Sequence, residues 1–184
     1  MQQGLVERAA EGDADAFATL ARLSSDRLYT VAYRILRDQY LAEDAVQGAL
    51  ITIWNELPRL RDPDKFEAWS YRVIVRASSE LGRRERRVAA APLLPADADR
   101  SVAPDEYRAL ADRDQLERGF RRLTPEQRAI LVLQHYAGLS LAEIAEVLGI
   151  KPGTAASRLH YATRALRASI EADSRSAAGK ERLA

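Results

Sequence analysis

The sequence contains no cysteine, which excludes disulfides, thiolate zinc sites and cysteine nucleophiles. It has two histidines, His135 and His160, and neither has a ligand partner at helical spacing, so we expect no metal site and no cofactor. No apolar run approaches the roughly 20 residues that span a bilayer. The acidic N-terminal stretch has no hydrophobic signal core. These absences favour a cytoplasmic protein without membrane insertion.

Charge of one sign is not in excess: 28 basic and 27 acidic residues give a formal net charge of +1. Affinity for nucleic acid would therefore have to come from local clusters. Strand signals are missing as well, because no two-residue alternation is sustained and no Asn-Gly or Asp-Gly turn occurs. Helical periodicity runs through nearly the whole chain, as in Leu28, Val31, Ile35 and Leu36. We expect an all-α protein.

One stretch interrupts the helical pattern. Residues 88–112 are rich in Ala, Pro and Asp and lack an apolar stripe, which predicts a flexible acidic linker with a helix beginning after Pro104. Small helical domains are expected on either side, at 1–87 and 113–173, and a disordered tail at 174–184. A surface loop inside one domain is the alternative.

The first domain ends in a helix with a basic terminus. Asp62 before Pro63 indicates an N-cap and a first-turn proline. The apolar face of the helix that follows carries Phe66, Trp69, Val73 and Ala77, and we expect the helix to end near Gly82. The predicted opposite face carries Tyr71, Ser78 and Ser79, with Arg72 and Arg76 adjacent. The basic run GRRERR at 82–87 can bind a nucleic-acid backbone, although such a run is equally typical of a solvated helix end.

The second domain has two helix starts with strong signals. Thr124-Pro125-Glu126-Gln127 and Ser140-Leu141-Ala142-Glu143 are both capping boxes. Gly149 stands where a left-handed C-terminal residue is wanted, and Pro152 suits the first position of the next helix. The predicted buried face of that helix is Ala155, Leu159, Ala162, Leu166 and Ile170. A short helix, a glycine corner and a longer helix predict a helix-turn-helix.

The other face of the longer helix is polar and basic. We expect backbone N–H groups near Gly153 and Thr154 to favour phosphate oxygens, and side chains of the first turns to reach base edges in the major groove. The predicted DNA-binding residues are Lys151, Gly153, Thr154, Ser157, Arg158, His160, Tyr161 and Arg164. The alternative is an ordinary pair of bundle helices whose arginines are solvated.

Three stretches carry a family resemblance. RRLTPEQRAILVLQHYAGLSLAEIAEVLGIKPGTAASRLHYATRALR resembles region four of bacterial sigma factors of the extracytoplasmic-function group, in which G-T-V-K-S-R-L opens the recognition helix. AEDAVQGALITIWNEL resembles their region two helix, and FEAWSYRVIVRASSELGRRERR resembles the promoter-melting helix that follows it. The resemblance covers roughly residues 5–87 and 113–172.

The resemblance implies a dissociable transcription-initiation subunit that bridges the β and β′ subunits of RNA polymerase core and promoter DNA. The second domain would read the minus-thirty-five element as duplex, and the first would capture single-stranded minus-ten bases. For the minus-ten element the matching positions are Tyr71, Arg72, Arg76, Ser79, Glu80, Arg83 and Arg84. For core polymerase they are Glu43, Asp44 and Gln47. The family also implies an anti-sigma factor that hides the DNA-facing surfaces and can hold the chain at the membrane.

Three departures from the family pattern matter. Gly48 replaces the usual glutamate, and Arg76 stands where many members have asparagine. Ala156 replaces the usual lysine, beside Ala155 in place of valine. One lost phosphate-neutralising lysine lowers the salt slope of binding by only about 0.9. We therefore expect weaker or altered upstream recognition and not the loss of DNA binding.

Two other functions remain as alternatives. An autonomous helix-turn-helix regulator would bind operator DNA without polymerase, but such regulators usually dimerise and the sequence has no heptad seam. An enzyme could use Glu43 with Asp44, or His160 with Tyr161, as acid–base pairs. Neither pair comes with a nucleophile, a phosphate loop or a metal set, so we predict no catalytic residue and no enzyme activity.

Overall fold

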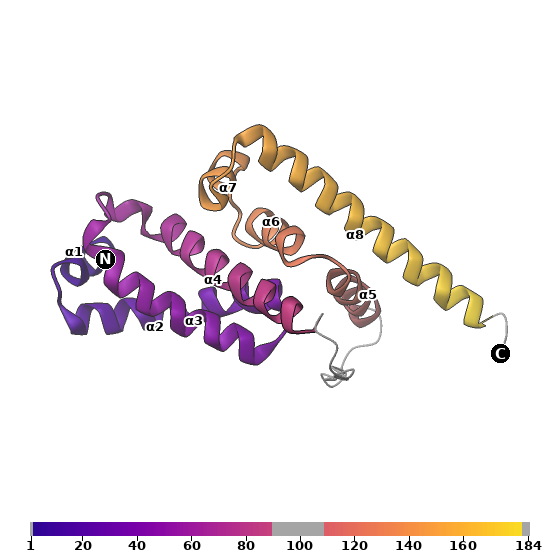
Figure 1. Ribbon diagram of the computed structural model, residues 1–184, viewed down its shortest axis with the longest axis horizontal. Coiled ribbons are helices and arrows are strands. Elements are labelled where there is room, and N and C mark those ends of the chain that lie inside the picture. The colour runs from indigo at the N-terminus through magenta and orange to yellow at the C-terminus, as the bar shows by residue number, and fades with distance from the viewer. Residues whose placement is uncertain (1, 90–108, 182–184) are drawn as a thin grey trace.

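A computed structural model describes residues 2–89 and 109–181, and every regular element in these ranges is a helix, as predicted. The first range, here called the N-terminal module, forms α1 (Gln2–Ala10), α2 (Ala14–Leu36), α3 (Gln39–Glu56), the 3₁₀ turns η1 (Leu57–Arg59) and η2 (Pro63–Lys65), and α4 (Phe66–Ala89). The second range, the C-terminal module, forms α5 (Ala109–Arg121), α6 (Pro125–His135), α7 (Leu141–Leu148) and α8 (Pro152–Glu181). Figure 1 shows α6 between α4 and the long α8.

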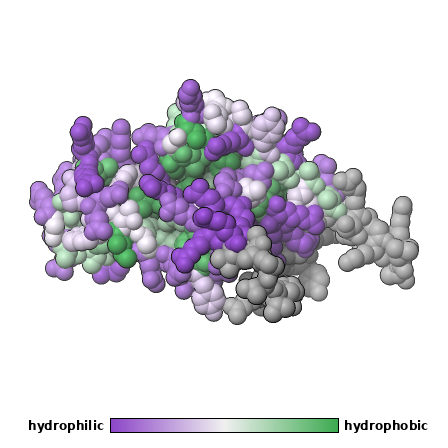
Figure 2. Space-filling model, in the orientation of Figure 1, coloured by the Kyte–Doolittle hydropathy of each residue, from purple (hydrophilic) through white to green (hydrophobic). Residues whose placement is uncertain are grey.

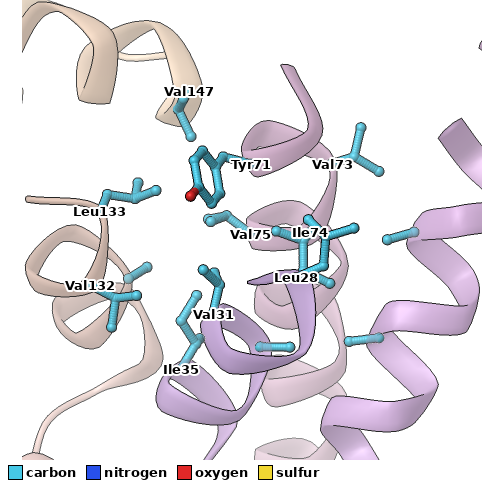
Figure 3. Close-up of a cluster of buried hydrophobic side chains, with 14 of the residues drawn as sticks. Leu28, Val31, Ile35, Tyr71, Val73, Ile74, Val75, Val132, Leu133 and Val147 are labelled. Atoms are coloured by element: carbon cyan, nitrogen blue, oxygen red, sulfur yellow. The ribbon is translucent and has the colours of Figure 1, made fainter. Parts of the chain in front are cut away.

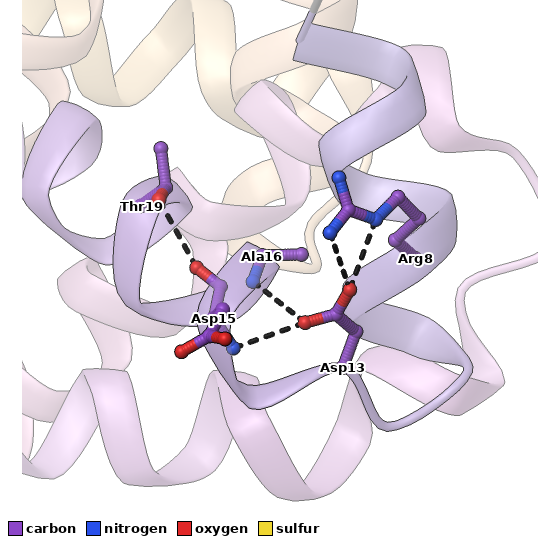
Figure 4. A network of polar contacts seen from close by, with 5 residues as sticks. All are labelled: Arg8, Asp13, Asp15, Ala16 and Thr19. Carbon is purple, nitrogen blue, oxygen red and sulfur yellow. Dashed lines mark hydrogen bonds and ion pairs between the residues drawn. The ribbon is translucent and has the colours of Figure 1, made fainter.

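A polar network fixes the corner between α1 and α2 (Figure 4). One carboxylate oxygen of the N-cap residue Asp13 accepts the N–H groups of Asp15 and Ala16 at 3.0 and 2.9 Å. The other oxygen accepts both Nε and Nη2 of Arg8, at 2.9 and 2.6 Å. The backbone bond to Ala16 and the Arg8 side chain keep the pKa of Asp13 below its ordinary value. The first helix is thereby tied to the α2 terminus.

Helix α4 is buried on more than the one predicted face. Phe66 and Val73 are buried as expected, but Tyr71 and Ser78 are also buried, at 3% and 0% exposure. The prediction that they lie on the open side is wrong for this structure. The reason is tertiary: α4 packs against α2 and α3 on one side and against α6 and α7 on another. The spacing of one apolar stripe along α4 cannot reveal that a second side of the helix packs against α6 and α7.

The predicted helix starts and the predicted turn of the C-terminal module are confirmed. In the first capping box the Thr124 N–H donates to Gln127 Oε1 at 3.0 Å, and the Gln127 N–H donates to Thr124 Oγ1 at 3.3 Å. Ser140 and Glu143 make the corresponding pair of bonds at 2.8 and 3.3 Å. Gly149 ends α7 in the left-handed region, with φ 63° and ψ 38°. This conformation turns the chain into α8 at little steric cost.

The expected element ends need correction. Helix α4 continues past the expected end at Gly82 to Ala89 and so enters the stretch 88–112 predicted as linker. Helix α5 begins at Ala109, in agreement with the helix expected after Pro104. Helix α8 continues to Glu181, through most of the predicted tail. Arg, Glu, Lys and Ala are strong helix formers and carry the helices beyond their apolar stripes. The remainder of the expected linker, 90–108, and residues 182–184 lie outside the described residues.

The two modules lie directly against each other, and we call this contact the seam. Helix α2 packs on α6, and α4 packs on α6 and α7. Tyr71 of α4 points toward Val147 of α7 and Leu133 of α6 (Figure 3), and all three are buried. Ion pairs flank this apolar contact: Arg72 with Glu146, Arg86 with Glu126, and Arg37 with Glu117. The hydrophobic core is therefore continuous across both modules.

Elsewhere the surface is mostly polar. Hydrophilic side chains cover much of the face in Figure 2, and the apolar ones gather in small patches. Among the described helices, none combines the length and the hydropathy needed to cross a bilayer.

Candidate nucleic-acid and polymerase interfaces

The predicted recognition face of α8 is open. Ala155 and Ala162 are buried against the module, whereas all eight predicted DNA-binding residues are exposed. Tyr161 is 63% exposed and meets the His160 ring edge-on, with 5.7 Å between the ring centroids. An aromatic ring held outward beside Arg158 and Arg164 suits contact with DNA bases and phosphates.

Backbone hydrogen bonds at the start of α8 bear on the prediction that free N–H groups there bind phosphate. The N–H groups of Thr154 and Ala155 both donate to the Lys151 carbonyl, at 2.9 and 3.0 Å. The Thr154 N–H is therefore already bonded, contrary to the prediction that it would be available to a phosphate. Ser157 Oγ donates to the Gly153 carbonyl at 2.8 Å, which leaves its lone pairs facing outward. The side-chain cations of this segment are therefore more available to an anion than the bonded Thr154 N–H.

The predicted minus-ten residues fall into two groups. Arg76, Glu80, Arg83 and Arg84 are exposed and Ser79 is half-buried along the outer side of α4. Arg76 Nε contacts Glu80 Oε1 at 3.1 Å, and Arg83 Nε donates to the Ser79 carbonyl at 3.2 Å. These residues form an open, mainly basic strip at the end of the helix.

The other two minus-ten residues, Tyr71 and Arg72, belong to the seam. Burial raises the pKa of the Tyr71 hydroxyl, although the guanidinium of Arg27, 4.9 Å from the ring centroid, acts in the opposite direction. Arg72 Nη2 donates to the Glu146 carbonyl at 3.0 Å and lies 3.6 Å from Glu146 Oε1. In this arrangement α6 and α7 cover part of the surface that the sequence assigns to single-stranded DNA.

Helix α3 presents the predicted polymerase contacts. Glu43, Asp44 and Gln47 are exposed, and Gln39 Nε2 donates to Glu43 Oε1 at 3.0 Å. Gly48 is exposed too, and a Cβ added there would meet no other atom within 4 Å. The position therefore has room for the start of a side chain such as the glutamate usual in the family.

The sequence reading missed the apolar part of this face. Tyr40, Ile51 and Trp54 are 64%, 64% and 37% exposed. With Asp44 and Gln47 they recur at steps of four, three, four and three residues, which places them along one side of the helix. That heptad-like spacing was available in the sequence and indicates a mixed apolar and polar face of α3 that is open to solvent.

The described residues contain no cluster of three or more His, Asp or Glu that could hold a metal ion. The exposed surfaces that could contact macromolecules are the cationic face of α8, the basic strip of α4 and the amphipathic face of α3.

Comparison with known proteins identifies the family. Sigma-70 region 2 matches residues 20–88, and Sigma-70 region 4 matches residues 113–166. The ECF RNA polymerase sigma factor SigL of Mycobacterium tuberculosis is 35% identical over 170 residues, which cover 87% of this chain and 94% of SigL. The chain belongs to the ECF RNA polymerase sigma factors. Sigma factors act in transcription initiation and are not enzymes, so the function predicted from sequence is confirmed and the autonomous regulator is not supported.

Other relatives agree with this assignment. The ECF sigma factor SigE of Mycolicibacterium smegmatis is 35% identical over 156 residues, 80% of this sigma factor but 59% of SigE. Among solved structures, CnrH in complex with the cytosolic domain of CnrY has a TM-score of 0.65 and 26% identity, over 94% of this chain and 98% of CnrH. The sigma factor RpoE of Bartonella quintana, solved with the anti-sigma factor NepR, has a TM-score of 0.67 at 23% identity over 85% of this chain and 98% of RpoE, which shows the same fold.

Proposed function

We propose that this sigma factor binds RNA polymerase core through the outer face of α3 and directs it to promoters through α4 and α8. The exposed carboxylates Glu43 and Asp44, the Gln47 amide and the apolar side chains of Ile51 and Trp54 support the first contact. Interfaces combine apolar anchors with a polar rim in this way. The β and β′ subunits are the partners that the family implies.

We propose that the recognition face of α8 binds the minus-thirty-five element. Eight predicted contact residues, all exposed on one short segment, form a surface that fits a major groove. The basic strip of α4, with Arg76, Arg83 and Arg84, would hold the single-stranded minus-ten segment. The modules corresponding to residues 1–87 and 113–173 would thus act at different parts of one promoter.

The contact between the two modules limits how far apart their DNA-binding surfaces can lie. The two promoter elements are separated by about 25 base pairs, or about 85 Å at 3.4 Å per base pair. A folded chain of this length has a radius of gyration of only about 16 Å. The closed arrangement cannot reach both elements at once, and it also buries Tyr71. We therefore infer that the modules separate when the protein is bound to polymerase and promoter.

A protein partner for the free sigma factor is also proposed. CnrH was solved with the cytosolic domain of CnrY, and RpoE with the anti-sigma factor NepR. An anti-sigma partner of this chain would compete with polymerase for the exposed faces. Where that partner is anchored in a membrane, it would hold the sigma factor there.

In vitro transcription tests the proposal. Purified chain and RNA polymerase core, incubated with genomic fragments, should give defined start sites, and neither component alone should do so. Reversing charge with Arg158→Glu and Arg164→Glu should lower initiation at those sites by at least tenfold, because repulsion replaces phosphate attraction. Arg59→Glu, an exposed change on η1, is the matched control. No binding to core, or unchanged start-site selection in the double variant, would overturn the proposal.

A further inference from the structure

A cavity of about 380 Å³ opens at the seam, away from the Tyr71 contact. Its walls come from both modules: Leu36, Leu41 and Gly82 from α2, α3 and α4, Leu123 from the turn before α6, and Pro125 from the start of α6. The volume falls within the range of small-molecule sites. It is too small for a folded segment of another protein.

The lining combines apolar side chains with four arginines, Arg86, Arg121, Arg122 and Arg128, and one carboxylate, Glu85. Arg86 pairs with Glu126 at 3.0 Å, and Arg122 also has a partner, so Arg121 and Arg128 contribute most of the positive charge that is left. Positive charge in a cavity repels metal cations and attracts anions.

Arg128 is a buried cation at the seam that lacks a full set of hydrogen-bond partners. Its side chain is buried at 7% exposure, and its Nε has no hydrogen-bond partner among the described residues. Burial first, and then the positive charges of Arg37 and Arg86, lower the pKa of Arg128 to about 10, against the opposing effect of the Glu126 carboxylate. Burying a guanidinium with an unbonded Nε beside other cations is unfavourable, and a further anion would offset this cost.

We propose that this seam cavity is a binding site for a small phosphorylated molecule of nucleotide size. Arginine forks match phosphate oxygens in geometry and charge, and several of them favour more than one phosphate group. The leucines of the lining, Leu36, Leu41 and Leu123, give an apolar surface for a ring or base. Neither an inorganic anion nor an uncharged ligand would use both the cationic and the apolar side chains.

The site also couples the ligand to the closed arrangement. Because its walls come from both modules, the cavity exists only while the seam is closed. A bound ligand therefore stabilises closure, and opening of the seam weakens ligand binding by the same factor. Such a ligand would oppose the open form that the promoter requires.

The first experiment measures binding to the full chain by calorimetry and thermal unfolding, with ATP, GDP and inorganic pyrophosphate as probes at constant ionic strength. A nucleotide should bind more tightly than pyrophosphate, and saturation should raise Tm by several degrees. Arg128→Met should leave the Tm of the free protein unchanged or higher, because it removes a buried unpaired charge. It should weaken nucleotide binding by about tenfold to a hundredfold. Arg59→Met is the matched control.

The second experiment tests the coupling. Glu146→Lys, which lies outside the cavity, places a cation beside Arg72 and should open the seam. Nucleotide affinity should fall in proportion to the closed fraction, which small-angle scattering measures in the same sample. Absence of binding by all three probes, full binding by Arg128→Met, or full binding by an opened Glu146→Lys variant would each overturn the proposal. Neither experiment uses polymerase or DNA, so failure here would not bear on the function proposed above.

Discussion

At the scale of single residues, Ala156 is the clearest departure of the recognition helix from its family. It is exposed one turn into α8, beside Ser157 and Arg158. Its methyl group is exposed, so a longer side chain at this position would extend into solvent. Charge at this point is therefore adjustable without disturbing the core.

Ala156→Lys should strengthen binding of the polymerase holoenzyme to its promoters several-fold at moderate salt. One further neutralised phosphate should steepen the dependence of log K on log salt by about 0.9. Promoter binding measured over a salt series gives both quantities. Ala168→Lys, on an exposed position of the same helix three turns further on, is the control. An equal slope change in both variants would mean that position 156 does not face a phosphate.

At the scale of elements, the capping boxes define the helix-turn-helix. Ser140 accepts the Glu143 N–H through Oγ, and without it the first turn of α7 loses a bond. Ser140→Ala should lower the free energy of unfolding by about 1 kcal/mol. Chemical denaturation of the full chain measures this loss. Ser140→Thr, which keeps a hydroxyl that can accept the Glu143 N–H and donate to the Glu143 carboxylate, should retain most of the stability and shows whether the cap itself is responsible.

The same box predicts a dependence on pH. Hydrogen bonds from the Ser140 side chain and backbone keep the pKa of Glu143 below its ordinary value of 4.5. A carboxyl whose folded pKa is lowered stabilises the fold fully above its unfolded pKa, and this contribution is lost as pH falls through the folded pKa. Between pH 6 and pH 3, the Tm of the natural chain should therefore fall more than that of Glu143→Gln, whose amide accepts the same bond without titrating. Parallel Tm curves would contradict this role.

Local signals explain which parts of the fold and site were predictable. Both capping boxes, Gly149 and the buried face of α8 depend on residues within a few positions of one another, and the structure agrees with the sequence at each. Tyr71 was misplaced because its burial depends on Val147, which is distant in the sequence and packs on α4 only through the seam. The cavity around Arg128 was likewise unpredictable, since its walls come from five elements. The exposed side of α3 was readable from spacing but concealed by its mixture of apolar and acidic residues.

At the scale of the whole molecule, the contacts at the seam favour a closed arrangement of the two modules, whereas the proposed function needs an open one. An apolar contact around Tyr71 and three flanking ion pairs hold the modules together, whereas the proposed binding to two distant promoter elements would require them apart. Such a balance is adjustable by modest free energies, because surface ion pairs contribute little each. Any partner that binds one arrangement better than the other therefore shifts it.

A disulfide across the seam tests whether opening is required. A side chain at Gly82 would place its Cβ 3.6 Å from Cβ of Pro125, within the range that a disulfide spans. The natural sequence has no cysteine, so Gly82→Cys with Pro125→Cys can form no other intramolecular pair. Oxidised, this variant should bind polymerase through the uncovered α3 but lose open-complex formation, and reduction should restore it. The two single-cysteine variants control for the substitutions themselves. Since the oxidised chain holds α4 against α6, undiminished promoter opening in that state would show that the closed arrangement is compatible with initiation.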